Sequence, residues 1–460
     1  MLGVGSFISG FCLIVQEAYF FRRIRHELAS THASPMIGAT INPSHLLSQL
    51  TDILDSDPCI DEVGFIHPSQ FASLNKEVHI PSSMSSEALS QPGDEISESK
   101  PAGASSSNTF FWHSEHKLGI STLVLVPLYN AAKDAFMNAL KRYRMLSDSN
   151  VQKDKLIDNN TSVCPASFLD IVESELMKRS KALVILSCDF GTAWNFRKLL
   201  VSKKQLLQMY MDELLLSTLV LSYSPKSERA WNHRRWVIKM IAEKCPNLQE
   251  IVETESELNS KMNYRAWNHR CWLISYMLDS QVLREWQNSR DWAGLHVADN
   301  SCFHYRARLL LRMTENLRNN HASDAFSRAK FHQMWKDELN WVAVLIKRYV
   351  GREALWLHRR FLSVLRMKYF AIDDECLSCD MNMFITEELK LFHSCTIIPD
   401  NDFGDFQAQA TYSATYIMWL AKQMPESFGV ELQICSRNEE LKSLLDKVGK
   451  SCLWDCFTAT

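Results

Sequence analysis

The sequence predicts an all-α protein, an α-α superhelix (solenoid) assembled from repeated helical hairpins. Residues that break helices are scarce, with 14 Gly and 13 Pro among 460 residues. Beyond residue 167, apolar residues recur mostly at the spacing of one helix face, with short breaks between runs. A short aromatic motif also returns at a nearly constant interval, which is typical of proteins built from stacked helical units.

Composition narrows the class further. Hydrophobic residues make up 46% of the chain, and Lys and Arg (50) nearly balance Asp and Glu (53), so the net charge of −3 gives no reason to expect nucleic acid as a partner. The 13 cysteines show no disulfide framework. The Cys-x-x-Cys pair Cys376 and Cys379 lacks the further ligands that a zinc site needs. We expect reduced thiols in a cytoplasmic protein, with no metal site in this chain.

The N-terminal part divides into three segments. Residues 1–41 form an extension whose apolar run from Leu2 to Phe21 contains Glu17, which favours an amphipathic or disordered extension, or an alternative start, over a membrane anchor. Residues 42–74 form an N-terminal helical segment. Residues 75–109 are rich in Ser and predict a disordered insertion.

Within residues 42–74, a start signal at Pro43 opens a helix that is expected to end near Asp57. A short extended piece is expected from Ile60 to Ile66.

Residues 110–370 are interpreted as the α-hairpin repeat solenoid and residues 371–460 as a C-terminal helical region. The first long helix is expected from about Ser121 to Arg144, followed by a polar loop through Asn160. No Gly-rich phosphate loop follows a predicted strand, which disfavours nucleotide-binding α/β folds.

The repeat is an aromatic residue followed three residues later by Arg. Its five copies contain Trp194 and Arg197, Trp231 and Arg234, Trp267 and Arg270, Phe303 and Arg306, and Trp356 and Arg359. The aromatic residues are 37, 36, 36 and 53 residues apart, and chance rarely gives three such nearly equal intervals. The repeat therefore carries most of the information in this sequence.

One unit shows how such a repeat folds. Apolar residues between Lys203 and Ser222 mark one helix, a break follows at Tyr223 to Pro225, and a second helix carries Trp231. A single hairpin cannot bury its apolar face, whereas stacked hairpins can.

Residues at i and i+3 share a helix face, so we expect each Trp to fill the seam between hairpins. We expect each guanidinium to bind carbonyls at the preceding turn. His233, His269 and His358 share the position two residues after the aromatic, on different hairpins, and are interpreted as repeat elements rather than a metal cluster.

The pattern Asn-Tyr-x-x-Trp-x-x-Arg resembles the repeat of the protein prenyltransferase α-subunit family, and residues 263–270 match it in full. Residues 60–66, 116–119, 189–197 and 292–306 make the resemblance closer to one branch of that family. The resemblance covers roughly residues 42–74 and 110–370.

For that branch the resemblance implies the α subunit of a type III geranylgeranyltransferase. Its expected partner is the β subunit of the Rab-type enzyme, and the expected protein substrate is a farnesylated SNARE. The complex would transfer a geranylgeranyl group from its diphosphate to a C-terminal cysteine. The resemblance places the catalytic zinc and the lipid pocket on the β subunit, with no cofactor in this chain.

The resemblance also suggests site residues. The Lys five residues before the second-repeat Trp, which contacts the diphosphate in related enzymes, is Lys226 here. The family Tyr three residues before that Trp is replaced by Glu228, so either the site is rearranged or Glu228 points away. The third repeat keeps Tyr264 and has Arg265 in place of the family His. Lys226 is also compatible with a solvated loop lysine, and Arg265 with a surface residue at a helix start.

A second function remains open at this point. A non-catalytic α-solenoid scaffold or escort for membrane-traffic proteins would use the same repeats for plain protein binding. Lys226 favours the enzyme subunit, and Glu228 favours the scaffold.

Overall fold

The structure is a computed structural model that describes residues 42–67, 70, 110–153, 165–244, 248–256, 263–319, 325–369, 377–396, 404–424, 437–447 and 449–458. The predicted N-terminal extension, the Ser-rich insertion and Cys376 lie outside these residues. The chain divides into one unit that ends at Lys244 and a second that begins at Cys245. The boundary falls inside the stretch that the sequence predicts as one repeat array.

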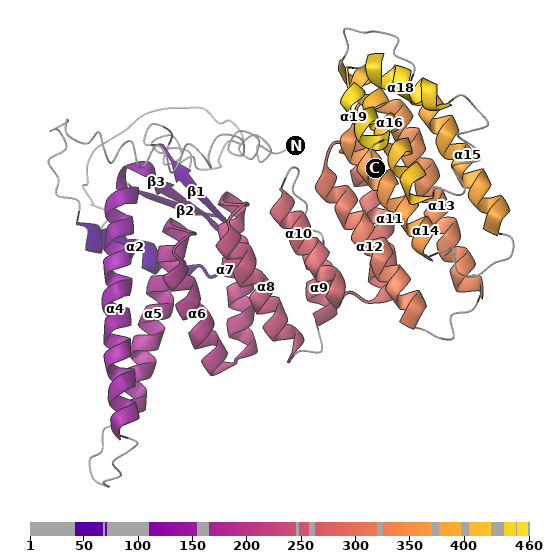
Figure 1. Cartoon of the computed structure of the whole chain (residues 1–460). Coiled ribbons are helices and arrows are strands. Elements are labelled where there is room, and N and C mark those ends of the chain that lie inside the picture. Colours follow the sequence, from indigo (N-terminus) through magenta and orange to yellow (C-terminus); the bar gives the residue numbers. More distant parts are fainter. Residues whose placement is uncertain are drawn as a thin grey trace, which may run out of the picture. The chain divides into compact units, whose positions relative to one another are not determined.

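The first unit combines a small sheet with helices (Figure 1). Its elements are α2 (Pro43–Ser56), β1 (Glu62–Ile66), β2 (Phe111–Ser114), β3 (Lys117–Ser121), η2 (Thr122–Val124), α4 (Leu125–Lys153), α5 (Pro165–Leu186), α6 (Gly191–Lys204), α7 (Leu207–Tyr223) and α8 (Glu228–Ala242).

The second unit is helical throughout the part that the structure describes. Its elements are α9 (Leu248–Ser256), α10 (Tyr264–Leu273), η3 (Ile274–Tyr276), α11 (Asp279–Leu295), α12 (Asn300–Asn319), α13 (Ala325–Arg348), α14 (Glu353–Tyr369), α15 (Leu377–Cys395), α16 (Gly404–Gln423), α18 (Arg437–Lys447) and α19 (Ser451–Thr458). Among the helices described in either unit, none combines the length and the apolar character needed to cross a membrane.

Six helical hairpins account for most of the described residues, which confirms the predicted all-α repeat fold. They are α5–α6, α7–α8, α9–α10, α11–α12, α13–α14 and α15–α16. We call the first helix of each hairpin helix A and the second helix B. The last hairpin lies in the C-terminal region, where the sequence predicts helices without a repeat.

The N-terminal segment folds as its local signals indicate. Asn42 caps α2, because its side chain accepts hydrogen bonds from the backbone N–H of Ser44 and His45, and Pro43 occupies the first helical turn. The predicted extended piece forms β1. The sequence predicts that a polar loop begins after Arg144. This start is wrong, because α4 continues to Lys153.

The three strands are ordered β1-β3-β2, with β1 parallel to β3 and β2 antiparallel to it. Glu115 and His116 join β2 to β3 with positive φ angles of 49° and 61°, the backbone of a tight two-residue hairpin turn. Asp57, at the end of α2, accepts hydrogen bonds from His113 Nε2 (2.9 Å) and His116 Nδ1 (3.0 Å). This carboxylate ties the hairpin to α2.

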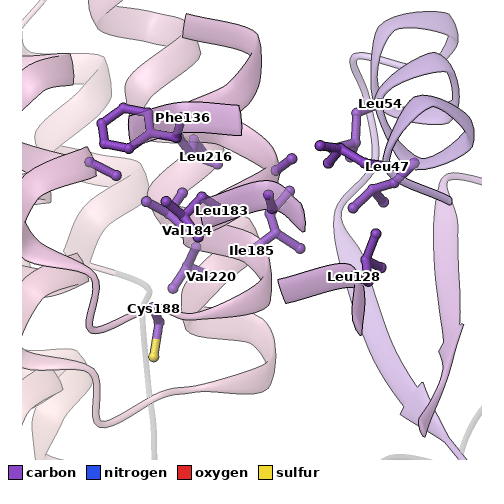
Figure 2. Close-up of a cluster of buried hydrophobic side chains, with 14 of the residues drawn as sticks. Leu47, Leu54, Leu128, Phe136, Leu183, Val184, Ile185, Cys188, Leu216 and Val220 are labelled. Atoms are coloured by element: carbon purple, nitrogen blue, oxygen red, sulfur yellow. The ribbon is translucent and has the colours of Figure 1, made fainter. Parts of the chain in front are cut away.

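The core of the first unit joins these elements to the hairpins. Figure 2 shows Leu47 and Leu54 of α2 near Leu128 of α4, with side chains of α5 and α7 beside them. The same buried cluster extends to Trp194 on helix B of the first hairpin. In this unit α4 and α2 therefore pack beside α5 of the first hairpin, and β1 of the sheet packs against α7.

Candidate functional site

Helix B of the first five hairpins begins three residues before the repeat aromatic. The first residues are Gly191, Glu228, Tyr264, Asn300 and Glu353. The family Tyr position is therefore the first residue of helix B, where backbone N–H groups still lack intrahelical partners. The candidate site residues lie at this end of the hairpins.

The repeat aromatics are buried. Trp194, Trp231, Trp267, Phe303 and Trp356 are between 2% and 5% exposed. Trp194 Nε1 donates to the carbonyl of Cys188 and Trp231 Nε1 to the carbonyl of Pro225, each at 2.8 Å and six residues earlier in the turn between helices A and B. The indole of Trp231 therefore fixes the turn that carries Lys226.

The repeat Arg residues bind helix A of their own hairpin. Arg197, Arg234, Arg306 and Arg359 each donate from Nη1 to the carbonyl 20 residues earlier, at 2.8 to 3.0 Å. The first three also donate to a Ser hydroxyl 17 residues earlier. The expectation that these carbonyls lie at the preceding turn is wrong, because the partner carbonyl lies on helix A.

Four of the repeat Arg residues also bind a buried carboxylate, which lies on helix A of the following hairpin. The pairs are Arg197 with Glu213, Arg270 with Glu285, Arg306 with Glu338, and Arg359 with Glu388. The same carboxylate accepts a hydrogen bond from helix B of its own hairpin, from His233, Tyr305, His358 and Tyr416 respectively. We call each Arg–Glu–His or Arg–Glu–Tyr set a relay; it connects two successive hairpins.

The charges of the relays follow from burial and pairing. Burial by itself would raise the pKa of Glu213, but the guanidinium of Arg197 and the hydrogen bond from His233 outweigh it and lower that pKa to about 2. The pKa of Glu338 is lowered to about 2 by Arg306 and His358 against the same effect of burial. Both residues are thus carboxylates at neutral pH.

Burial lowers the pKa of His233 and His358, and their bonds to Glu213 and Glu338 only partly offset it. Both imidazoles are therefore neutral at pH 7. Since a carboxylate only accepts, Nε2 carries the proton of each ring. The histidines act as hydrogen-bond donors that hold the relays. Among the described residues, no group of three or more His, Cys, Asp or Glu side chains is arranged to hold a metal ion.

The four Glu residues were missed in the sequence. Glu213, Glu285 and Glu338 each lie 20 residues before their His or Tyr partner. That spacing was a readable signal once the His position had been recognised. Glu388 lies 28 residues before Tyr416, and Ala414 occupies the aromatic position of that hairpin, so no motif marked it.

Gln409 joins the sixth hairpin to the fifth. Its Oε1 accepts from the backbone N–H of Gly351 (3.0 Å) and from Trp356 Nε1 (3.2 Å). Its Nε2 donates to the carbonyl of Ile346 (2.9 Å) and to Cys395 Sγ (3.4 Å). One buried amide therefore ties α16 to the turn between α13 and α14 and to α15.

The first part of the candidate site is the turn between α7 and α8. Lys226 is exposed there, and Ser227 caps α8 by accepting from the N–H of Ala230 (3.3 Å). Glu228 is the first residue of α8, and its Oε1 accepts from Asn232 Nδ2 at 3.3 Å. Asn232 Oδ1 accepts in turn from Arg235 at 2.5 Å. Glu228 is therefore engaged along the exposed side of α8.

The second part lies at the start of α10. Asn263 caps this helix by accepting from the backbone N–H of Arg265 (3.1 Å) and Ala266 (3.4 Å). Tyr264 is 56% exposed, and the Arg265 guanidinium lies 5.3 Å from the centroid of its ring. Lys226 belongs to the first unit, and Tyr264 and Arg265 belong to the second.

Tyr264 also borders a groove of about 210 Å³ between α10 and α12. The lining residues are Tyr264, Trp267, Asn268, Cys271, Asn300, Ser301 and His304. Burial raises the pKa of the Cys271 thiol to about 12, which excludes a thiolate nucleophile at neutral pH. Burial, with the charge of Arg308, lowers the pKa of His304, so its imidazole is neutral. The groove offers neutral hydrogen-bonding groups beside aromatic rings.

Comparison with known proteins agrees with this architecture. Residues 210–241 match the family described as "Protein prenyltransferase alpha subunit repeat", and this stretch lies within the hairpin α7–α8.

Curated relatives carry the name "Protein prenyltransferase alpha subunit repeat-containing protein 1". The one from Danio rerio is 31% identical over 243 residues, which cover 41% of this chain and 54% of the relative. The one from Homo sapiens is 31% identical over 240 residues, which cover 42% of this chain and 59% of the relative. The chain thus spans just over half the length of the relatives it matches. The chain is therefore similar to proteins that contain the protein prenyltransferase α-subunit repeat, and the repeated helical hairpins agree with that similarity.

Proposed function

We propose that the chain is the α-type subunit of a heterodimeric protein prenyltransferase and supports transfer of a geranylgeranyl group to a C-terminal cysteine of a target protein. The observation that carries the proposal is the repeat, which places the exposed Lys226 just before helix B in one unit and the exposed Tyr264 with the half-buried Arg265 at the start of helix B in the other. These are cationic and hydroxyl groups of the kind that bind a diphosphate.

In the proposed reaction the thiolate sulfur of the target attacks C1 of the isoprenoid. The C1–O bond breaks, and the diphosphate leaves with the bonding electron pair. Zinc on a β subunit of the Rab type would hold the thiolate. The part of this chain is electrostatic: Lys226 of the first unit would stabilise the leaving diphosphate. Tyr264 and Arg265 of the second unit are proposed separately as substrate-binding residues, through a hydroxyl donor and a guanidinium.

Glu228 occupies the position at which the family pattern has Tyr, and this difference has the clearest consequence for diphosphate binding. A carboxylate facing a diphosphate would be repulsive. Its bond to Asn232 supports a function in which this carboxylate is kept along α8 while Lys226 faces the ligand. The same residue is the observation that favours the second candidate function, a non-catalytic scaffold or escort for membrane-traffic proteins.

Co-expression and transfer assays separate the two functions. The full chain would be co-purified with a Rab-type β subunit and supplied with labelled geranylgeranyl diphosphate and a farnesylated SNARE acceptor, at cytoplasmic pH. A stoichiometric complex that transfers label, where the chain alone does not, is the expected result. A chain that binds no prenyltransferase β subunit would refute the proposal and leave the scaffold.

A further inference from the structure

A second groove, of about 420 Å³, lies on the exposed side of α14 and α16 in the second unit. The lining residues are Arg360, Val364, Met367, Lys368, Trp419 and Gln423. Val364, Met367 and Trp419 are partly buried and form its apolar part, whereas Arg360 and Lys368 are exposed. It shares no lining residue with the groove beside Tyr264.

The charged side chains that line this second groove are all positive. Residues 354–369 and 406–424 contain no Asp or Glu, although both helices are otherwise rich in polar groups. Neither Arg360 nor Lys368 forms an ion pair with a carboxylate among the described residues, whereas Arg352, just before α14, is paired with Asp405. The groove therefore offers two cations whose counter-charge the described part of this chain does not supply.

The geometry of Arg360 selects the type of ligand. Its guanidinium lies 4.3 Å from the centroid of the Trp419 ring. Stacking restrains the guanidinium and leaves the N–H groups at its edge available for a bidentate carboxylate. It also covers the ring face on which a nucleic-acid base would stack, so the groove suits an acidic peptide better than a single strand.

We propose that this groove binds a short acidic peptide segment of a partner protein, through two carboxylates with an apolar side chain between them. Arg360 and Lys368 are eight residues apart on α14, which corresponds to about 12 Å along the helix. An extended peptide covers that length in about four residues. The apolar side chain would pack against Val364, Met367 and Trp419. The interaction is independent of prenyl transfer, so either proposal stands if the other fails.

The test uses the full chain and a fluorescein-labelled peptide, Gly-Glu-Ser-Leu-Ser-Glu-Gly amide, whose two Glu residues are four positions apart. Binding is measured by fluorescence anisotropy. Arg360→Gln and Lys368→Gln are each expected to weaken binding by about five- to tenfold. Replacing both Glu of the peptide by Gln should abolish binding. Lys336→Gln is the matched control, because Lys336 is an exposed cation on α13 outside the groove.

Three outcomes would overturn the proposal. The first is the absence of an anisotropy change at protein concentrations up to about 0.5 mM. The second is equal weakening by Lys336→Gln, which would indicate general attraction to basic surface. The third is tighter binding of single-stranded oligothymidylate, or of vesicles of phosphatidylcholine and phosphatidylserine, that is equally sensitive to Arg360→Gln.

Discussion

Arg306 binds both carboxylate oxygens of Glu338, at 2.9 and 2.7 Å, and neither side chain has any exposure to solvent. The two residues are 32 positions apart and lie on successive hairpins, α11–α12 and α13–α14. Removal of one partner of such a buried pair leaves an uncompensated charge, which costs more than the pair contributes while intact. Replacement of either residue is therefore expected to destabilise the second unit.

We expect Glu338→Gln to lower the free energy of unfolding by about 3–5 kcal/mol, because the substitution keeps the shape and removes the charge that Arg306 faces. Urea denaturation followed by circular dichroism measures the change. Glu315→Gln is the control, since Glu315 is exposed on the same helix as Arg306, and it should change stability by less than about 0.5 kcal/mol. Equal effects of the two substitutions would contradict the assigned role of the relay.

Stability should fall with acid in two steps. Unfolded His titrates near pH 6.5, whereas burial lowers the folded pKa of His233 and His358. Between these values the unfolded state binds more protons, so the contribution is full above pH 6.5 and is lost as the pH falls through the folded pKa. A second loss begins near pH 4.5, because the pKa of Glu213 and of Glu338 is about 2 in the folded state.

Urea denaturation between about pH 8 and pH 3 tests this dependence. His233→Gln with His358→Gln should flatten the first step, because a Gln amide can still donate to the carboxylate but does not titrate. The second step should persist in this double variant. Stability that is unchanged between pH 7 and the acid step would refute neutral, buried histidines.

Two Trp residues with equal burial should respond differently to replacement by Phe. Trp194 and Trp267 are each 2% exposed, but Trp194 Nε1 donates to the Cys188 carbonyl, and Trp267 Nε1 has no hydrogen-bond partner among the described residues. We expect Trp194→Phe to cost about 1 kcal/mol more than Trp267→Phe, through the lost hydrogen bond. Thermal and urea denaturation of both variants gives the comparison, and the reverse order would contradict it.

Gly351 lies in the turn between α13 and α14 with a φ of +75°, and a Cβ there would lie 2.8 Å from the Asp405 carbonyl oxygen. The positive φ and the short contact both disfavour a residue with a Cβ at this position. Gly351→Ala should therefore destabilise the protein by about 1–3 kcal/mol. Gly404→Ala is the matched control, because a Cβ at Gly404 meets nothing within 4 Å. A neutral Gly351→Ala variant would show that the turn can relax away from α16.

Lys226→Ala tests the proposed chemistry. In the assembled complex we expect it to lower kcat/KM by on the order of 10-fold to 100-fold through loss of a charge near the leaving group, without weakening assembly. Lys239→Ala, which changes an exposed lysine in the last turn of α8, serves as the control. Unchanged turnover in Lys226→Ala would remove this residue from the mechanism.

The sequence predicted those features that repeat and are chemically distinctive. Trp and Arg are large, and their position at i and i+3 recurs often enough to mark helix B in four hairpins. The relay Glu residues were not found, because the sequence pattern does not show whether a Glu within a helix is buried or exposed. Only the fold brings Glu213 between Arg197 and His233.

Periodicity also failed to separate the two faces of α7. The apolar residues Leu207 and Leu215 are 49% and 59% exposed, whereas Tyr210 and Leu214 on the same helix are buried. Apolar residues lie on both faces of this helix, so no stripe stood out. The site residues are predictable in identity from the family pattern. Their geometry depends on the cap and side-chain bonds around Glu228 and Arg265, which the pattern does not encode.

The spacing inside the relays constrains how the chain length can vary. Four hairpins keep 20 residues between the repeat Arg and its helix A carbonyl, whereas the interval from Arg to the next relay Glu grows from 16 residues at Arg197 to 32 at Arg306. Extra residues between Arg306 and Glu338 are accommodated in the longer helices α12 and α13 and in the linker between them, and the sixth hairpin has 28 residues between Glu388 and Tyr416. An affinity tag or a reporter domain for this protein should therefore be inserted in a linker between a helix B and the following helix A, where the number of residues between the relay partners already varies.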